Sequence, residues 1–413
     1  MKPNDKEING QVENHYELSL GDPYNLLPPY KNPIFTSLTQ RYNHCYVIGK
    51  TGAGKSTLLE NMALYDIDFG ASVIFIDPSG LSTRRLYYAA KDKSRIRYIS
   101  IDQPMKINLL NREGYDLETI MQEFIQILDV MISLTASNPE STVMMRMIIR
   151  MALRAIKDKD RDLNFVNKLL IDKQARKDIL NNLKEGTDVY QFWKHFDDRE
   201  NWQYRESAQR TATRLLEICS GKMKDFAIGK NELDMSDIAE NGKVLLVDTS
   251  RMSKLGQIYL SSLLVYAVYS YCDYTPNINR DPKDQKPLLV YVDEFANVVS
   301  SVFSDLLFRA RKCGIGFTFA HQNFSQIRKE HEYIVNDAIS TVWTNICFMC
   351  GLRESKELAP IFNCTQKDLL NLDPYNAYIR MQKVVNLARL WEPILEFTPP
   401  APQPYNFLAD TWI

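Results

Sequence analysis

The sequence of 413 residues predicts an α/β fold with a mostly parallel central sheet that is interrupted by an all-helical segment. Three observations lead to this prediction. Short apolar runs alternate with helical stretches in both halves of the chain, which is typical of βαβ units and a parallel sheet. The first of these runs ends in a glycine-rich loop that opens a helix. Between residues 112 and 241 apolar residues recur at intervals of three and four instead, which predicts helices.

The expected strands are short and apolar, and the expected helices are longer and periodic. The predicted strands cover residues 45–48, 72–76, 96–101, 244–247, 288–292, 316–320 and 346–350. The predicted helices of the interruption cover residues 117–134, 141–156, 163–170 and 204–219. We therefore expect an N-terminal arm or short β-addition (1–40), an α/β domain (41–111 and 242–390), an all-α insertion (112–241) and a Pro-rich C-terminal tail (391–413).

Composition and charge exclude several classes of protein. Hydrophobic residues make up 45% of the chain and charged residues 24%, so a mainly disordered or fibrous chain is excluded. Fifty basic residues against 51 acidic ones give a net charge of -1. This balance excludes a wholly basic nucleic-acid coat, although it leaves room for a basic channel within an assembly.

The cysteines and the longest apolar stretch indicate a reduced, cytoplasmic protein. Seven Cys in a chain of this length do not form a disulfide framework. Cys347 and Cys350 form a CxxC pattern inside an apolar stretch, which favours a buried strand over a metal site. The longest apolar stretch, Ile258 to Cys272, contains serines and is shorter than the ~20 residues that a bilayer crossing needs.

The glycine-rich loop after the first strand matches the pattern GxxxxGK[ST]. Glycines let the backbone curl so that its N–H groups point at phosphate oxygens, and the helix N-terminus adds a positive dipole end. Lys55 would bridge the β- and γ-phosphates of a nucleotide, and the Ser56 hydroxyl would coordinate Mg²⁺. The predicted ATP-binding residues are Gly49, Lys50, Thr51, Gly52, Ala53, Gly54, Lys55, Ser56 and Thr57.

A second motif consists of the apolar run 288–292 followed by Asp293 and Glu294. Such a run predicts a buried strand that delivers two carboxylates to its C-terminal end, where ligands bind in open α/β sheets. We expect Asp293 to hold the Mg²⁺ shell and Glu294 to orient and deprotonate the attacking water. A base that activates water favours an ATPase over a small-molecule kinase.

Two further polar residues follow from the next predicted elements. The strand 316–320 ends at His321 and Gln322, and the Gln322 amide is the better choice for a sensor of the γ-phosphate. Arg311, near the end of the preceding basic stretch, could stabilise the charge on the transferring phosphoryl group from across a subunit boundary. The alternative for Arg311 is an ordinary basic helix end on the surface.

Together these motifs resemble the conjugative type IV secretion coupling proteins (TraG/TraD-like) of the HerA–FtsK superfamily. The resemblance spans roughly residues 40 to 365 and depends on the order of the motifs around a helical block. The segments that carry it are residues 46–59, 70–78, 108–110, 192–193, 242–246, 292–295 and 310–314. The chain departs from the family at Ser79 and Leu81, where relatives commonly have His and Asp.

The resemblance implies a RecA-like P-loop ATPase that forms a homo-hexamer and moves DNA through its channel. It implies that Gln322 is the sensor and that Arg311 acts across the interface. Relaxase and secretion-system proteins are the implied partners. The chain resembles a member without the N-terminal membrane helices of many relatives, so the implied location is the cytoplasm, or the inner membrane through partner proteins.

Two stretches of the insertion are candidates for contact with nucleic acid. Arg146, Arg150 and Arg154 form one helical stripe that could follow phosphates or face solvent. The aromatic residues between Thr187 and Arg205 could stack on bases or form the core of the helical domain. DNA binding therefore follows from the resemblance more than from these residues.

Two alternatives to a conjugative DNA translocase remain at this point. One is a HerA-like DNA-processing or viral genome-packaging ATPase. The other is an adaptor that uses ATP as an assembly switch and binds protein secretion substrates through residues 112–241.

Overall fold

The computed structural model describes residues 7–8, 11–12, 16–23, 34–112, 114–135, 142–157, 161–274, 286–298, 303–326, 332–391 and 393–395. The chain divides into two compact units, which we call the sheet unit and the helical unit. The sheet unit comprises residues 1–99, 235–250 and 271–413, and the helical unit comprises residues 100–234 and 251–270. The helical unit thus includes residues 100–111 and 251–270, which the sequence analysis places in the α/β domain.

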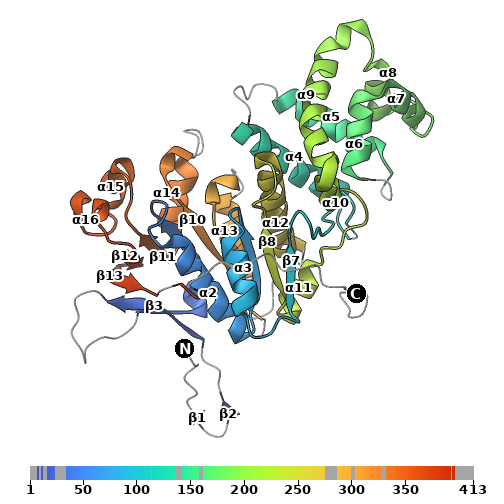
Figure 1. Cartoon of the computed structure of the whole chain (residues 1–413). Coiled ribbons are helices and arrows are strands. Elements are labelled where there is room, and N and C mark those ends of the chain that lie inside the picture. Colours follow the sequence, from blue (N-terminus) through green and yellow to red (C-terminus); the bar gives the residue numbers. More distant parts are fainter. Residues whose placement is uncertain are drawn as a thin grey trace. The chain divides into compact units, whose positions relative to one another are not determined.

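The sheet unit is built on an 11-stranded sheet (Figure 1) with the order β4-β3-β13-β12-β11-β5-β10-β9-β6-β8-β7. Its strands are β3 (Glu17–Pro23), β4 (Ile34–Ser37), β5 (Cys45–Ile48), β6 (Ser72–Asp77), β7 (Ile96–Ile99), β8 (Val244–Asp248), β9 (Leu288–Val292), β10 (Ile315–His321), β11 (Thr344–Cys347), β12 (Asn376–Met381) and β13 (Val384–Leu390). A separate short hairpin pairs β1 (Glu7–Ile8) with β2 (Gln11–Val12).

The strands from β11 to β7 pair in parallel, which confirms the predicted mostly parallel sheet. Each of these strands is buried along nearly its whole length, as expected for a sheet covered on both faces. Parallel strands end at one edge, so the loops after β5, β6, β9 and β10 meet there. Two predicted strands differ from the structure by two or more residues at an end: β7 ends at Ile99 rather than at residue 101, and β11 runs from Thr344 to Cys347 rather than from residue 346 to residue 350.

The other edge of the sheet is antiparallel and was not predicted from the sequence, apart from the suggestion of a β-addition in the N-terminal arm. β11 pairs with β12, β12 with β13, β13 with β3, and β3 with β4. The described part of the arm therefore extends the sheet beside a C-terminal hairpin. The Pro-rich tail from residue 396 onward lies outside the described residues.

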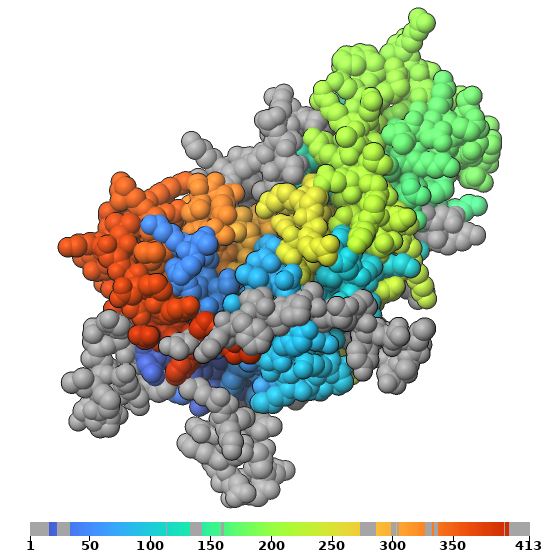
Figure 2. Space-filling model, in the orientation of Figure 1, coloured from blue at the N-terminus to red at the C-terminus, as the bar shows by residue number. Residues whose placement is uncertain are grey.

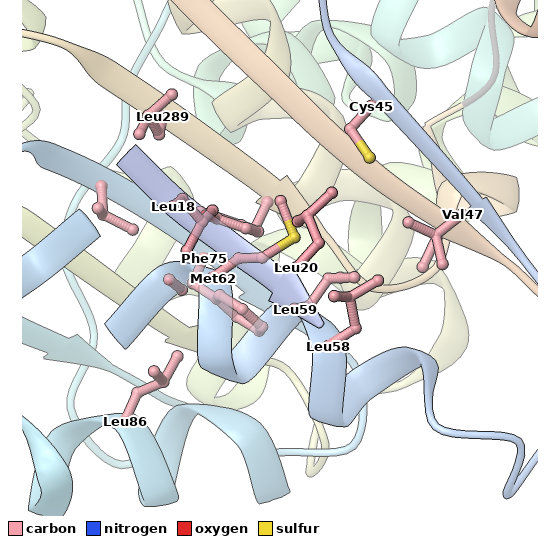
Figure 3. Packing of buried hydrophobic residues seen from close by; sticks show 14 of the residues in the cluster. Leu18, Leu20, Cys45, Val47, Leu58, Leu59, Met62, Phe75, Leu86 and Leu289 are labelled. Carbon is pink, nitrogen blue, oxygen red and sulfur yellow. The ribbon is translucent and has the colours of Figure 1, made fainter. Parts of the chain in front are cut away.

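One face of the sheet packs against helix α2 (Lys55–Phe69), which follows the glycine-rich loop. Leu58, Leu59 and Met62 of α2 are at most 2% exposed, and they lie beside Leu18 and Leu20 of β3 (Figure 3). The N-terminal strand thus buries its apolar side chains against the helix that begins at the predicted phosphate site. Burial of this kind is the main stabilising contribution in folding.

A buried network of hydrogen bonds joins the N-terminal arm and helix α1 to helix α2 and strand β9. Arg41 donates hydrogen bonds to Asp66 of α2 at 3.1 Å and to the Tyr291 hydroxyl of β9 at 2.7 Å. Tyr16 and Tyr291 both donate to the Asp66 carboxylate. Arg41 and Asp66 are 3% and 0% exposed, so each is a charge that needs its partner inside the protein.

The other helices of the sheet unit pack against the sheet or lie at the edge where its parallel strands end. They are α1 (Leu38–Arg41), α3 (Leu81–Ala89), α11 (Met235–Asn241), α13 (Phe303–Lys312), α14 (Glu332–Thr341), α15 (Leu352–Leu358) and α16 (Gln366–Leu370). In the space-filling view the surface of the segment that begins at the glycine-rich loop (blue) lies next to that of the C-terminal segment (orange to red) (Figure 2).

The helical unit contains no strand among its described residues. Its helices are α4 (Leu117–Thr135), α5 (Thr142–Ala155), α6 (Leu163–Ile171), α7 (Lys173–Leu180), α8 (Asp188–His195), α9 (Trp202–Cys219), α10 (Lys224–Ala227) and most of α12 (Lys254–Tyr274). Helices α4, α5, α6 and α9 were predicted within a few residues, whereas α7 and α8 were not. No helix of the described chain has the length and apolar character needed to cross a bilayer.

Candidate functional site

The glycine-rich loop lies at the C-terminal edge of the sheet, between β5 and α2. Gly52 and Gly54 have φ angles of +79° and +115°, which side chains other than glycine rarely adopt. A Cβ on Gly54 would also lie 3.1 Å from the rings of Phe348 and Tyr375. Glycine suits both positions because the backbone there adopts φ angles that other residues rarely take. At Gly54 the rings of Phe348 and Tyr375 also leave little room for a side chain.

Contacts with the end of β10 and with the segment after β11 fix the start of the loop. The Gly49 N–H donates to the carbonyl of His321 at 3.2 Å, and the Lys50 N–H donates to the carbonyl of Met349 at 2.7 Å. The Lys55 ammonium donates to the Lys50 carbonyl at 3.0 Å, and burial lowers its pKa. Lys55, which the sequence predicts to bind phosphate, is thus held against the backbone at the start of the loop.

Ser56 and Asp293 meet at the position predicted for the metal ion. The Ser56 hydroxyl donates to the Asp293 carboxylate at 2.7 Å. Burial and the nearby Asp77 carboxylate raise the pKa of Asp293 to about 7. A hydroxyl and a carboxylate that favours a neighbouring positive charge fit Mg²⁺, which is usually bound by one or two protein oxygens together with phosphate oxygens.

The described residues contain no cluster of three or more His, Cys, Asp or Glu side chains that could hold a metal ion by themselves. Ser56 and Asp293 supply two protein oxygens, which suits an ion whose shell is completed by a nucleotide.

Glu294 follows directly and is held by two amides. Gln322 Nε2 donates to Glu294 Oε2 at 3.1 Å, and Gln326 Nε2 reaches the same oxygen at 3.4 Å. The predicted base and the predicted sensor are thus in direct contact. Gln326 was missed in the sequence because it lies beyond the strand, in the short turn η8 (Phe324–Gln326).

Gln322 also connects to the glycine-rich loop. The Thr51 hydroxyl donates to Gln322 Oε1 at 3.2 Å. The Gln322 amide therefore accepts from the phosphate loop on one side and donates to the base on the other. This arrangement orients the amide so that its NH₂ group faces Glu294.

His321 is a structural neighbour of the site and not a cation in it. Its Nδ1 lies 3.1 Å from the Tyr46 hydroxyl, and burial lowers its pKa to about 3. The ring is 0% exposed and remains neutral at physiological pH. Of the two neighbours at the end of β10, only Gln322 contacts the predicted base.

Arg311 is exposed near the end of α13 and is not among the residues that line the cleft of this chain. The structure brings together every other predicted catalytic and metal residue, but leaves Arg311 outside. Its action across a subunit boundary remains a prediction.

The cleft around these residues has a volume of about 450 Å³, within the usual range for a small-molecule site. Of the predicted ATP-binding residues, Gly49, Lys50 and Ala53 do not line the cleft. The cleft is also lined by residues that the sequence analysis did not single out as site residues: Glu60, Pro78, Ser79, Leu81, Ser82, Arg85, Ala320 and Tyr375. Tyr375 was missed because it approaches from the unpredicted C-terminal hairpin. Its N–H donates to the Ala53 carbonyl at 3.0 Å.

The segment from Ser79 to Leu81, where the chain departs from the pattern of the coupling-protein family, lies at the start of helix α3. Asp77 accepts hydrogen bonds from the backbone N–H groups of Ser79, Ser82 and Thr83 and so caps helix α3. Gly80 has a φ of +71°, and a Cβ there would lie 2.4 Å from the Asp248 carboxylate. Ser79 donates its hydroxyl to Asp77, so it belongs to this cap.

In the helical unit, two arginines of the basic stripe are bound to another helix. Arg146 pairs with Asp129 of α4 at 2.8 Å, and Arg154 pairs with Glu118 of the same helix. The stripe is therefore partly neutralised by acids of α4 rather than being an open cationic track.

The aromatic residues of α8 pack into the helical unit. Trp193 and Phe196 are 2% and 1% exposed, and the Trp193 indole donates to the Met151 carbonyl at 3.1 Å. Phe192 lies edge-on to Trp193 and Tyr204. Of the two interpretations of this stretch, a core is confirmed for Trp193 and Phe196, whereas Trp202 is 54% exposed.

Cys347 and Cys350 are both 0% exposed, as expected from their apolar context. Cys347 ends β11, while Cys350 lies after the strand. Neither belongs to a metal cluster in the described part of the chain.

Comparison with known proteins identifies relatives of this arrangement. Residues 38–268 match the family model described as "Helicase HerA, central domain", and residues 287–357 match "TraM recognition site of TraD and TraG". Among curated proteins, none matches by sequence.

Several solved structures share the fold. The bacterial conjugative coupling protein TrwBΔN70 in complex with sulphate aligns with a TM-score of 0.68 at 17% identity, over 87% of this chain and 86% of its own. TrwB in complex with ADP and Mg²⁺ aligns with a TM-score of 0.67 at 16% identity, over 87% of both chains. VirB4 of Thermoanaerobacter pseudethanolicus aligns with a TM-score of 0.59 at 14% identity, over 91% of this chain and 96% of its own. These likenesses confirm the predicted RecA-like P-loop fold.

Proposed function

Because the chain belongs to the family of the HerA helicase central domain, we propose that it is a Mg²⁺-dependent ATPase that moves DNA in conjugative or mobile-element transfer. The observation that carries the proposal is the contact between the glycine-rich loop and the paired acids. Ser56 meets Asp293 at 2.7 Å, while Glu294 lies under the Gln322 amide at 3.1 Å. A water-activating base beside a phosphate loop suits hydrolysis better than transfer to a second substrate.

Each residue of the cleft has a role in this proposal. The loop N–H groups and Lys55 bind the phosphates of ATP, and Ser56 and Asp293 hold Mg²⁺, which neutralises charge that develops on the phosphates. Glu294 accepts a proton from the attacking water, and the two glutamine amides keep its carboxylate in place. The solved TrwB structures with ADP and Mg²⁺ and with a non-hydrolysable ATP analogue support this assignment of ligands.

The proposed assembly is a homo-hexamer in which Arg311 of one subunit reaches the nucleotide of the next. Its exposure and its place outside the lining of the cleft of its own chain are consistent with such a role. Relaxase and secretion-system proteins are the proposed partners, and the match to a TraM recognition site over residues 287–357 supports a protein partner. The proposed location is the cytoplasm, with attachment to the inner membrane through those partners.

The test is steady-state ATP hydrolysis without nucleic acid, with single-stranded DNA and with duplex DNA, using Lys55→Ala as the blank. We expect DNA to stimulate hydrolysis and the blank to be inactive. The preferred strand type separates transfer from DNA-end processing or packaging.

The contrary result is a rate that no DNA changes, measured on protein shown to be oligomeric. Combined with capture of a defined protein substrate by the full chain, it would establish the ATP-switched secretion adaptor in place of the DNA translocase.

A further inference from the structure

A partly buried ion pair lines the nucleotide cleft on the side of helix α3, and none of the functions assigned above uses it. Glu60 of α2 is 1% exposed, and Arg85 of α3 is 21% exposed. Arg85 Nη1 donates to both oxygens of the Glu60 carboxylate, at 3.2 and 3.4 Å. The Ser82 hydroxyl donates to the same carboxylate at 2.8 Å. Both members of the pair line the cleft.

The position of Glu60 places this pair on the metal side of α2. Ser56 and Glu60 are four residues apart on one helix, so their side chains lie on the same face. The Arg85 guanidinium, which is bound to Glu60, therefore lies on the same side of α2 as Ser56 and its partner Asp293.

The balance of charge in the cleft gives Arg85 a use there. The described lining residues contain three acids, Glu60, Asp293 and Glu294. Against them stand two cations, Lys55 and Arg85. A nucleoside triphosphate adds several negative charges, and one lysine with one divalent ion leaves part of this charge unbalanced. A planar guanidinium is the group best suited to bind phosphate oxygens in pairs.

The burial of Glu60 also needs an explanation. A carboxylate beside a phosphate site repels the ligand, and its own burial raises its pKa. Holding an arginine in a fixed direction explains why an acid lies there, since Arg85 pairs with Glu60 through Nη1 and is at the same time one of the residues that line the cleft.

We infer that Arg85 is a phosphate-binding residue acting within its own subunit, and that Glu60 and Ser82 position its guanidinium. The inference rests on the proposed function, because it assumes that the cleft binds a nucleoside triphosphate. Arg85 would complement Lys55 from the α3 side of the cleft, independently of Arg311 and of the state of assembly.

The chain offers a closely matched control in the neighbouring residue Arg84. Arg84 is 22% exposed and pairs with the buried Asp248 at 3.3 Å, but it does not line the cleft. Arg84 and Arg85 therefore make comparable ion pairs from the same helix, and only one of them faces the nucleotide.

The experiment measures the Kd of a fluorescent ATP analogue with Mg²⁺ and the Tm without nucleotide. The variants are Arg85→Gln, Arg85→Lys, Glu60→Gln and Arg84→Gln, with Lys55→Ala as reference. We expect Arg85→Gln to raise the Kd about tenfold or more. Arg85→Lys and Glu60→Gln should raise it less, because each keeps part of the interaction. Arg84→Gln should lower the Tm about as much as Arg85→Gln while leaving the Kd within twofold.

An Arg85→Gln variant that binds ATP like the wild type would overturn the inference, as would an equal loss in Arg84→Gln. If Arg85→Gln does not fold, Arg85→Lys decides in the same way: an unchanged Kd overturns the inference and a raised one supports it. Failure of the proposed function looks different, since wild type and Lys55→Ala would then bind ATP equally or not at all.

Discussion

The Thr51 hydroxyl donates a hydrogen bond of 3.2 Å to the side-chain oxygen of Gln322. A residue of the phosphate loop thus orients the amide that holds the proposed base. Because an amide has a donor end and an acceptor end, Thr51 determines which end faces Glu294. The state of the phosphate loop and the position of the base are therefore linked by two hydrogen bonds.

Thr51→Val removes this hydroxyl with little change in shape, so we expect kcat to fall roughly 3- to 10-fold, the effect of losing one hydrogen bond. The Kd for ATP should not change, since the loop N–H groups remain. Steady-state kinetics and nucleotide titration measure the two quantities. Thr51→Ser is the control and should retain wild-type kcat; a valine variant with wild-type kcat would contradict the proposed link.

Glu294→Gln keeps the size of the side chain and removes its ability to accept a proton. We expect roughly a 10²- to 10⁴-fold loss of kcat with ATP binding retained, which is the range for removal of a general base. Single-turnover hydrolysis and ATP titration on the same preparation separate chemistry from binding. Near-normal turnover in this variant would exclude Glu294 as the base.

Gly80→Ala should destabilise the sheet unit because two penalties coincide. The left-handed backbone costs about 1 to 2 kcal/mol for a residue with a Cβ, and the close approach of Asp248 adds about 1 to 3 kcal/mol. Gly70→Ala is the control in the same unit, since its φ is +101° and a Cβ there would meet no atom within 4 Å. Chemical denaturation of both variants should show the larger loss at Gly80.

The contribution of His44 to stability should fall in mild acid because its ring is held neutral. Its Nδ1 accepts from the Phe317 N–H at 3.0 Å, and its Nε2 donates to the Leu307 carbonyl at 2.7 Å. Burial lowers its pKa to about 4, against about 6.5 in an unfolded chain. Between these two values the unfolded state binds a proton at His44 that the native state does not, so the contribution of His44 to native stability decreases as the pH falls from 6.5 to 4.

The comparison that isolates this effect is wild type against His44→Gln. At pH 7.5 the variant should be less stable, because it loses both hydrogen bonds. At pH 5 the difference should shrink by about 2 kcal/mol, which corresponds to 1.5 pH units below the unfolded pKa. Denaturant titrations at the two pH values measure it, and a difference that does not depend on pH would refute the neutral state of His44.

Trp193→Ala should destabilise the helical unit by about 3 to 5 kcal/mol, the usual result of emptying a buried aromatic position. The exposed Trp202 provides the control, and its replacement by Ala should have a much smaller effect. Differential scanning calorimetry in the presence of ATP would follow both units. The transition of the helical unit should move while nucleotide binding remains, because Trp193 does not line the cleft.

The parts of the fold that could be predicted are those whose sequence pattern is local. The strands at 45–48 and 288–292 are unbroken apolar runs, and their bounds in the structure are the predicted ones. The hairpin of β12 and β13 could not be found in this way. Its strands mix apolar residues with polar and charged ones, as in Asn376–Met381, so neither an unbroken apolar run nor a regular alternation marks them in the sequence.

The candidate site shows the same division. Lys55, Ser56, Asp293 and Glu294 belong to motifs with fixed spacing, so their proximity followed from the chain itself. Arg85, Gln326 and Tyr375 have no such spacing. Arg85 and Tyr375 line the cleft and Gln326 contacts Glu294 only because α3, the C-terminal hairpin and the turn after β10 converge there, and this convergence depends on tertiary packing.

The central place of β5 in the sheet determines when the nucleotide cleft can form during synthesis of the chain. Cys45 pairs with Thr318 of β10 and Thr344 of β11, which follow it by 273 and 299 residues (318 minus 45, and 344 minus 45). Loops of this length close late and slowly. The ribosome therefore delivers a phosphate loop whose strand has no neighbours until most of the protein has emerged. The helical unit has most of its residues in one continuous stretch and can fold while the newly made β5 still awaits its partners.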